Sequence, residues 1–336
     1  MTLETILLDH GAGGKLAHRL TTEVMLPILG NPILDGLHDG AVFDLPAGRV
    51  AFSTDTYTVT PLFFPGGSIG DLAVNGTVND VAMCGARPIF LSLALVIEEG
   101  LAVADLERIL NDVAAAARRA QVAVVTGDTK VVPRGAADKI FINTAGVGVV
   151  AEGVNIGGHR ARPGDKVLLS GTIADHGMTI MTQRADLGLA LEMQSDSAPL
   201  NRMVQRMLAA AEGIHVLRDP TRGGLGTALC EIALQSRVAI RIDESAVPIQ
   251  PAVAGACELL GFDPLYVANE GKLIAAVAPE DEAAVLAAMR ADEHGRAACT
   301  IGEVTTGPPG QVTLTTAIGG ERIVDMLAGE QLPRIC

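Results

Sequence analysis

The chain has 336 residues, of which 49% are hydrophobic and only 3% aromatic, and it carries a formal net charge of −14. This length favours about two domains. The acidity disfavours nucleic acid and anionic membranes as partners, and the scarcity of aromatic rings disfavours a base-stacking surface. The five cysteines form no CxxC pair, which favours a reducing cytoplasm over a disulfide scaffold or a zinc site. We recognise no signal peptide and no run of 18 apolar residues, so we expect no membrane span.

A glycine-rich stretch lies near the start of the chain, with three glycines in four positions (Gly11, Gly13 and Gly14) followed by Lys15. Glycine lets the backbone turn its amides toward an anion, and the lysine adds a positive charge. The stretch resembles a phosphate-binding loop but lacks the usual spacing of one, and a flexible arm is an equally good interpretation.

A strand is predicted from Arg49, ending in Ser53-Thr54-Asp55, where the carboxylate is suited either to a metal or to a turn. Ser68 then caps a helix that runs to about Cys84. Asn79 and Asp80 are poor helix formers inside this apolar helix, which suggests that they belong to a site.

Arg87-Pro88 is expected to end that helix, and a buried strand, a helix and a second strand follow. After that strand, at about Val125, we predict a compact ionic loop that contains Gly127, Asp128, Thr129 and Lys130, with Arg134 nearby. Asp128 suits Mg²⁺ and the cations suit phosphate, whereas the alternative is a solvated charged hairpin. A strand over 139–150 ends the first half.

The second half begins after a Gly-rich linker at 153–164. Asp175-His176 lies at a predicted helix start, where a cap and a satisfied imidazole are favoured over catalysis. A later strand ends in Asp219, a candidate metal ligand, and Arg222-Gly223-Gly224 then opens a helix whose N-terminus suits phosphate. Glu270, between two apolar runs, is predicted to be either a general base or part of a charged turn.

The end of the chain reads Pro333-Arg334-Ile335-Cys336, after a predicted hairpin through 307–310. A terminal cysteine is unusual for a structural thiol, and we expect Arg334 to favour its thiolate; the alternative is an accidental cysteine. The other four cysteines, Cys84, Cys230, Cys257 and Cys299, have apolar neighbours and are predicted to be packing residues.

Taken together, the STD, NDVAMCGA, GDTK and DPTRGG motifs and the GAGGK stretch resemble the ATP-binding superfamily of aminoimidazole ribonucleotide synthetase and selenophosphate synthetase, over essentially the whole chain. The TGDTKVVPRGAADK, ANEGK and terminal PRIC stretches resemble the carbamoyl dehydratases of hydrogenase maturation. The Gly-rich loop holds no thiol, unlike that of selenophosphate synthetases, and aminoimidazole ribonucleotide synthetases have no PRIC tail.

This resemblance implies a PurM-like α/β fold with mixed sheets, in which residues 1–155 bind ATP, 156–323 form a second α/β domain and 324–336 form a mobile tail. It implies a homodimer with a β-barrel-like core and ATP near the interface. We expect inward and outward positions of the tail, the inward one favoured by ATP.

The resemblance also implies a reaction and its partners. The carbamoyltransferase HypF loads a carbamoyl group onto Cys336, and ATP with Mg²⁺ drives its dehydration to a protein-bound thiocyanate. An iron-carrying HypC–HypD complex then accepts cyanide for [NiFe]-hydrogenase. A synthetase acting on a free small molecule and a non-catalytic nucleotide-binding scaffold are the alternatives.

The implied site residues fall into three groups. The catalytic residues are Cys336, Glu270 and Lys130, and the division of roles between the last two is open. Mg²⁺ is held by Asp55, Asp80 and Asp219, with Asp128 as a further candidate. The nucleotide is bound by Gly13, Gly14, Lys15, Asn79, Gly127, Asp128, Thr129, Arg134, Arg222, Gly223 and Gly224.

Overall fold

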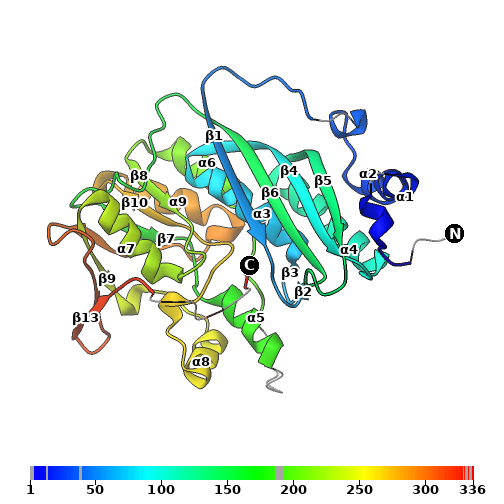
Figure 1. Ribbon diagram of the computed structural model, residues 1–336. Helices are drawn as coiled ribbons and strands as arrows, with labels where there is room; N and C mark the ends of the chain where they lie inside the picture. Colours follow the sequence, from blue (N-terminus) through cyan, green and yellow to red (C-terminus); the bar gives the residue numbers. More distant parts are fainter. Residues whose placement is uncertain are drawn as a thin grey trace.

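The computed structural model describes residues 4–12, 14–37, 40–185, 193–327, 329, 332 and 335–336, in two α/β halves that pack against each other (Figure 1). The first half holds a four-stranded sheet in which β4 and β5 run parallel and the other neighbours antiparallel. Its strands in spatial order are β1 (Arg49–Tyr57), β6 (Ile140–Val150), β4 (Ala86–Glu98) and β5 (Ala123–Val132). Helices α3 (Ile69–Met83) and α4 (Val103–Ala120) pack on one face.

Burial in the strand β6 alternates from residue to residue, which is the pattern of a sheet with one covered face. The strand predicted over 139–150 is thereby confirmed. The predicted helix after Ser68 is also confirmed, because the Ser68 hydroxyl accepts a hydrogen bond from Gly70 N at 3.1 Å. Helix α3 is buried on nearly all sides, since the sheet covers one side and the second half of the molecule another.

Two predicted boundaries in this half are wrong. Residues 126–130 do not form a loop after a strand but continue β5 to Val132, paired residue by residue with β4. Arg87 and Pro88 lie inside β4, where the register shift between Pro88 and Phe90 accommodates the proline. The pairing with β4 satisfies backbone groups that the polar side chains would otherwise lead one to place in a loop.

Short elements precede and follow the main strands of the first half. A helical segment of α, π and α turns comprises α1 (Lys15–Arg19), η2 (Leu20–Met25) and α2 (Leu26–Leu29), and β2 (Phe63–Phe64) pairs with β3 (Gly67–Ser68). The 3₁₀ turns are η1 (Leu8–Gly11), η3 (Leu34–Gly36), η4 (Glu244–Ala246), η5 (Pro264–Tyr266), η6 (Pro279–Asp281) and η7 (Glu293–Gly295).

The second half is built on a seven-stranded sheet in which only β9 and β12 are parallel neighbours. Its strands in spatial order are β13 (Glu321–Val324), β12 (Val312–Thr315), β9 (Ala239–Asp243), β11 (Cys299–Thr305), β7 (Lys166–Leu169), β10 (Ile274–Val277) and β8 (Ile214–Arg218). Its helices are α5 (Asp175–Ala185), α6 (Asn201–Ala210), α7 (Gly224–Ser236), α8 (Pro251–Leu260) and α9 (Glu282–Arg290).

The hairpin predicted through residues 307–310 is wrong, because β9 lies between β11 and β12 and pairs with both. The Gly-Pro turn signal is local and reports a change of direction only. The strand that lies between β11 and β12 is determined by packing across the whole sheet.

Residues from the second half enter the hydrophobic core of the first. Ile180 of α5, Ala268 and Ile335 pack among the residues of α3, α4 and β4, while Ala82 and Met83 pack against the second sheet. The two halves therefore share apolar contacts on both sides of their boundary. In the described residues, no helix has the length and apolar character needed to cross a membrane.

Candidate functional site

The end of the chain lies inside the molecule, between the two halves (Figure 1). Ile335 is only 3% exposed, and its carbonyl oxygen lies 2.9 Å from His176 Nε2. The carbonyl oxygen of Cys336 accepts a hydrogen bond from Thr58 N at 3.3 Å. The tail thus takes an inward position that places the terminal thiol at the boundary of the two halves. Pro333 and Arg334 lie outside the described residues.

The thiol of Cys336 lies beside the carboxyl group of Glu270, and each group shifts the pKa of the other. Burial raises the pKa of this thiol well above its usual range, the Glu270 and Asp55 carboxylates raise it further, and Arg222 opposes them. The predicted thiolate is therefore wrong for this position of the tail. A protonated thiol is a poor nucleophile, so the inward position protects the cysteine and exposes it only to the chemistry of the site.

Glu270 is a buried carboxyl group with unused hydrogen-bonding capacity. The residue is 4% exposed, and its Oε1 has no hydrogen-bond partner among the described residues. Burial raises its pKa well above the usual range, and nearby Asp196, Asp219 and Asp55 raise it further. Its backbone N–H is fixed at 3.2 Å from Asp196 Oδ1. Such a fixed, partly unsatisfied carboxyl group next to a thiol is suited to proton transfer on a group carried by that sulfur.

The segment before Glu270 is held by a buried ion pair. Asp196 Oδ2 lies 3.0 Å from Lys272 Nζ and accepts a hydrogen bond from Gly271 N at 3.1 Å. The side chains of Asp196 and Lys272 are 3% and 11% exposed, so water screens the pair little. The sequence did not single out Asp196, because it lies among polar residues and belongs to none of the motifs.

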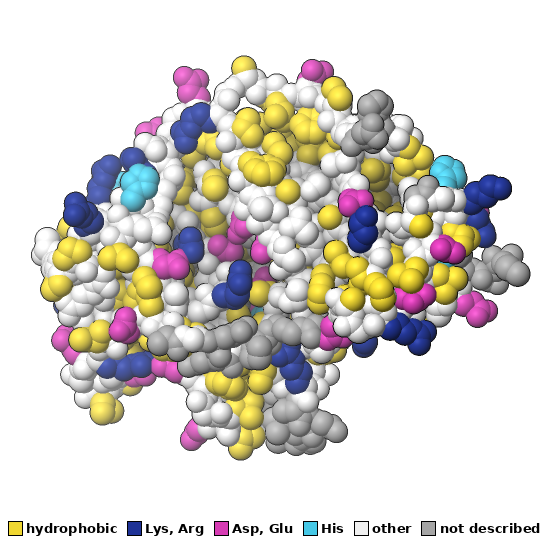
Figure 2. All heavy atoms as spheres, viewed as in Figure 1, with side chains coloured by type: hydrophobic (Ala, Val, Ile, Leu, Met, Phe, Trp, Pro, Cys, Tyr) yellow, Lys and Arg dark blue, Asp and Glu magenta, His cyan; other side chains and the backbone are white. Residues whose placement is uncertain are grey.

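Three predicted metal ligands, Asp55 of β1, Asp80 of α3 and Asp219 after β8, influence one another electrostatically. Desolvation and then the Asp80 and Asp55 carboxylates raise the pKa of Asp219 to about 7. Burial and Asp55 also raise the pKa of Asp80, against a hydrogen bond from Ser53 Oγ at 2.7 Å. Acidic side chains gather near the middle of the view in Figure 2.

These carboxylates fit a divalent cation in one respect. A bound cation would relieve the repulsion that raises their pKa values, and oxygen ligands suit Mg²⁺. However, the described residues contain no group of three potential metal-ligating side chains already close enough to hold an ion. A ligand that brings its own oxygens would have to complete the coordination.

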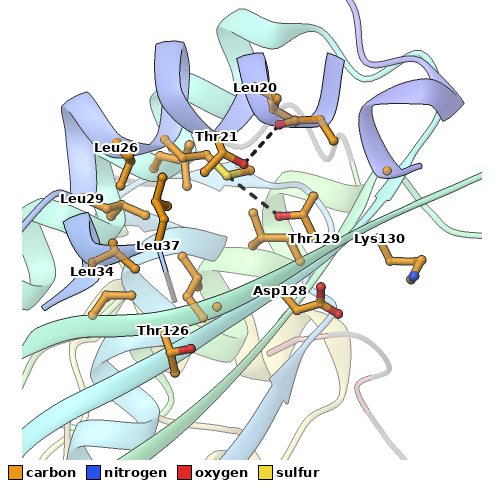
Figure 3. Close-up of a pocket in the computed structure, with 18 of the residues that line it drawn as sticks. Leu20, Thr21, Leu26, Leu29, Leu34, Leu37, Thr126, Asp128, Thr129 and Lys130 are labelled. Carbon is orange, nitrogen blue, oxygen red and sulfur yellow. Dashed lines mark hydrogen bonds between the residues drawn. The ribbon is translucent and has the colours of Figure 1, made fainter. Parts of the chain in front are cut away.

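A cavity of about 580 Å³ lies between the N-terminal helical segment and the strands β4 and β5. Figure 3 shows leucines such as Leu26 and Leu29 on one side, and Asp128 and Lys130 of β5 on the other. The cavity therefore has an apolar end and a charged end. The turn η1, just before this helical segment, lies closely against β5, because a Cβ at Gly11 would lie 2.6 Å from Val131 N.

A second cavity, of about 550 Å³, borders the tail. It is lined by Arg222, Gly223, Thr58 and Cys336, among others. The predicted nucleotide-binding residues thus divide: Gly127, Asp128 and Thr129 line the first cavity, and Arg222 and Gly223 line the second. Lys130, predicted to be catalytic, also lines the first cavity.

Strand register separates Asp128 from the three carboxylates within one chain. Asp55 and Asp128 lie on β1 and β5, the two opposite edges of the sheet. Asp55 is in the row of the buried residues Thr144 and Leu93, whereas Asp128 is in the adjacent row and so points to the other face. Three strand spacings amount to about 14 Å. Asp128 is therefore not a fourth ligand of the same ion within a single chain.

Asn79, predicted to contact the nucleotide, is bound by protein groups on both of its amide atoms. Its amide nitrogen donates to Ala198 O at 3.0 Å and Glu270 O at 3.3 Å, and its oxygen accepts from Leu200 N at 2.8 Å. All three contacts join α3 to the second half. The amide group is thus fully used by protein partners and helps position Glu270.

The remaining predicted residues lie elsewhere. Gly14 is the N-cap of α1 and Lys15 its first residue; Arg134 lies in the turn after β5, with its guanidinium 3.0 Å from where a Cβ of Gly100 would be. Gly224 begins α7 close to the backbone of η5. Neither of the two cavities is lined by Gly14, Lys15, Arg134 or Gly224, and Gly13 lies outside the described residues.

Three of the four cysteines predicted to pack in the interior do so at least in part. Cys230 and Cys257 are buried and Cys299 is half-buried. Cys84 is exposed, so its prediction is wrong: it is the C-cap of α3, where the helix ends and the chain turns away. Partial desolvation of its sulfur nevertheless raises the pKa of its thiol, and the nearby Asp80 and Asp219 raise it further.

The relatives of this chain share both of its halves. Residues 37–150 and 162–315 match the family models described as the N-terminal and C-terminal domains of AIR synthase related protein. A protein named carbamoyl dehydratase HypE from Bradyrhizobium diazoefficiens is 54% identical over 330 residues, which cover 98% of this chain and 95% of that protein. The protein of the same name from Escherichia coli K12 is 44% identical and covers 99% of this chain and 100% of that protein.

Solved structures agree with these relatives. The crystal structure of a hydrogenase maturation protein HypE in complex with ATP has a TM-score of 0.96 at 52% identity and covers 100% of both chains. A HypE–HypF complex has a TM-score of 0.81 at 46% identity, covering 92% of this chain and 99% of that one. These matches confirm the predicted α/β fold with mixed sheets. This chain belongs to the carbamoyl dehydratase HypE family of AIR synthase related proteins.

Proposed function

We propose that this chain is an ATP-dependent carbamoyl dehydratase whose substrate is a carbamoyl group carried on its own Cys336. The observation that supports this most directly is the inward thiol beside a buried Glu270, whose Oε1 has no hydrogen-bond partner among the described residues. An unmodified cysteine side chain needs no such neighbouring carboxyl group. A group attached to the sulfur would meet a carboxylate fixed to act on it.

The proposed reaction balances as follows. The oxygen of S–C(=O)–NH₂ bonds to the γ-phosphorus of ATP, and ADP leaves. The carbon–oxygen bond then breaks with phosphate as the leaving group, while the nitrogen loses its protons and S–C≡N forms. The sum is thiocarboxamide plus ATP giving thiocyanate, ADP and phosphate, with the oxygen of the lost water transferred to phosphate. The cyanide ligand for the iron of [NiFe]-hydrogenase would derive from this thiocyanate.

Glu270 is assigned the role of base toward the nitrogen. A raised pKa brings the carboxylate closer to the basicity that such a step needs. Lys130 lines the first cavity, and no hydrogen bond joins it to Glu270 in the described part of the chain. We therefore assign Lys130 the task of offsetting the charge of the phosphates. Mg²⁺, when bound with ATP by Asp55, Asp80 and Asp219, would neutralise the transferring phosphoryl group.

The nucleotide is proposed to occupy the first cavity, whose leucine end suits an adenine ring and whose charged end suits phosphates. The relative crystallised with ATP supports nucleotide binding in this family. Because β5 and β1 are opposite edges of the sheet, one chain does not bring that cavity and the three carboxylates together. We propose that a homodimer does so, with the phosphates of a nucleotide bound by one copy reaching the carboxylates of the other.

The open face of the four-stranded sheet is the proposed dimer surface. Phe52 and Val50 of β1 are 67% and 51% exposed, and Val96 of β4 is 36% exposed. Figure 2 shows hydrophobic side chains gathered over these strands toward the top of the view. Phe52→Asp should convert a dimer to a monomer in light scattering, whereas Ile318→Asp, at a 97% exposed position of the other half, should not. A monomeric wild type would contradict the proposal.

HypF is the proposed carbamoyl donor and an iron-carrying HypC–HypD complex the proposed cyanide acceptor. A solved HypE–HypF complex of a relative supports the first of these partners. Because the inward thiol is enclosed between the halves, we propose that the end of the chain, within the tail expected over residues 324–336, swings outward to meet both partners. The proposed division of the chain at 155 and 323 leaves this tail outside the two domains.

The deciding experiment is intact mass after incubation with carbamoyl phosphate, ATP, Mg²⁺ and the carbamoyltransferase. The expected result is the gain of one carbamoyl group followed by the loss of one water, both absent from a chain lacking Cys336. If ATP turnover is unaffected by removal of Cys336 and no adduct forms, the chain acts on a free small molecule instead. If ATP binds and is not hydrolysed even on the carbamoylated chain, it is a scaffold.

A further inference from the structure

The buried imidazole of His176 joins the tail to the interior of the protein. The side chain is fully buried; its Nε2 lies 2.9 Å from Ile335 O and its Nδ1 lies 2.8 Å from Ser195 Oγ. A carbonyl oxygen only accepts hydrogen bonds, so Nε2 must carry the hydrogen. Burial lowers the pKa of the imidazole, so the ring is neutral and Nδ1 accepts the Ser195 hydroxyl hydrogen. Both ring nitrogens thus have defined roles.

The hydroxyl group that fixes this tautomer is itself held in place. Ser195 Oγ accepts a hydrogen bond from Ser197 N at 3.1 Å, and Ser195 N donates to Pro65 O at 2.9 Å. Asn75 of α3 donates to Ser197 Oγ at 3.0 Å. The ring of His176 also meets Phe64 edge-on, with the centroids 5.6 Å apart. The imidazole therefore has one orientation, set by both halves of the molecule.

Few polar groups of the described residues hold the last two residues of the chain, whereas residues 325–327 are bound separately by Tyr266 and Thr227. Besides His176, the described hydrogen bonds to the backbone of Ile335 and Cys336 come from Thr58, through its N–H at 3.3 Å from Cys336 O and its hydroxyl at 3.5 Å. The His176 bond is shorter than either, and it is made by a buried side chain to the residue directly before Cys336. Loss of this donor would leave the buried carbonyl oxygen of Ile335 unsatisfied.

We propose that His176 is a latch that holds the tail in its inward position, and so a positioning residue for the reaction at Cys336. The proposal rests on the proposed function for the meaning of the inward position but not for the contact itself. In the released state the thiol would be open to the partner proteins, and in the latched state it would lie against Glu270. The balance between the two states is therefore set partly by one hydrogen bond.

Two substitutions test the roles of the two ring nitrogens independently. The amide of His176→Asn reaches the position of Nδ1 and keeps the Ser195 contact, whereas the amide nitrogen of His176→Gln reaches the position of Nε2 and keeps the donor to Ile335. The readout is the rate at which an excess of iodoacetamide alkylates Cys336, followed by the mass of the C-terminal peptide, on the full-length chain without ATP. This rate follows the fraction of molecules with the tail released.

We expect His176→Asn to raise the alkylation rate of Cys336 about tenfold, and His176→Gln to stay within about threefold of wild type. Alkylation of the buried Cys230 and Cys257 should not change, because a loosened fold would raise all three rates together. Equal rates for the Asn and Gln variants, or no rise in the Asn variant, would overturn the proposal.

If His176→Asn also exposes the buried cysteines, the alkylation rate of Cys336 is measured in Ser195→Ala instead, because this variant removes only the hydroxyl group that fixes the tautomer. A selective rise at Cys336 then supports the latch, and an unchanged rate refutes it. The test needs neither ATP nor a carbamoyl donor. Failure of the dehydratase proposal would appear in the mass experiment with Cys336 intact, while failure of the latch would appear here alone.

Discussion

Replacement of Asp219 by asparagine should stabilise the ligand-free protein while it abolishes the proposed use of the metal. Desolvation and the neighbouring Asp80 and Asp55 raise the pKa of Asp219 from 3.8 to about 7. Above pH 7 the ionised carboxylate therefore has a lower free energy in the unfolded chain than in the folded chain, and it destabilises the fold. Each pKa unit corresponds to about 1.4 kcal/mol, which gives about 4 kcal/mol as an upper limit. Since the side chain is half-buried and partly screened, we take about 2 kcal/mol.

The sign of the pH dependence follows from the direction of the change. An acid whose pKa is raised by folding favours the folded state only while it is protonated, so stability is lost between about pH 3.8 and pH 7. The Asp219→Asn chain escapes this loss. At pH 8 its Tm should exceed that of wild type by about 3 °C, and at pH 5 the gain should be about a third as large.

Differential scanning calorimetry without nucleotide at the two pH values measures this effect. Excess Mg²⁺ should reduce the difference in Tm between the variant and wild type at pH 8, because a cation relieves the same repulsion in wild type. The matched control is Asp243→Asn: Asp243 is exposed, and hydrogen bonds from Ser245 lower its pKa, so its replacement should lower Tm slightly. A gain at Asp219 that is equal at both pH values, or a loss, would refute the electrostatic reasoning.

Three further substitutions test the site. Gly11→Ala places a Cβ against the backbone of β5 and should open η1 and the helical segment that follows it to limited proteolysis. Gly14→Ala, whose Cβ would have no heavy atom within 4 Å, should not do so. Equal digestion of the two variants would contradict the close approach. Glu270→Gln should leave ATP binding intact and slow water loss about 10²- to 10⁴-fold, so that the carbamoylated mass accumulates; normal water loss would remove Glu270 as the base. Ser53→Ala deletes a hydrogen bond that lowers the pKa of Asp80, and the pH of half-maximal Mg-ATP binding should shift upward; a downward or absent shift in calorimetric titrations would count against Asp80 as a ligand.

The sequence by itself determined the elements whose pattern is local. The period-two burial of β6, the capped helix α3 and the position of Asp219 directly after β8 could be read from neighbouring residues, whereas Asp55 and Asp128 lie within β1 and β5 instead of at their ends. The motifs, taken with the terminal cysteine, also led to the family, because such motifs combine only where one chemistry needs them all. Each element and each single motif depends on residues that are near one another in the sequence, and the family follows from the combination of such motifs along the chain.

Tertiary structure decided which distant groups meet, and with what charge. Residues 126–130 look like a loop but form a strand, because β4 satisfies their backbone. His176 and Ile335 are 159 residues apart and yet share a hydrogen bond. The thiol of Cys336, expected to ionise easily, is held protonated by burial and by Glu270. No local pattern carries this information, since pKa values and hydrogen-bond partners depend on the solvent exclusion that only the packed chain creates.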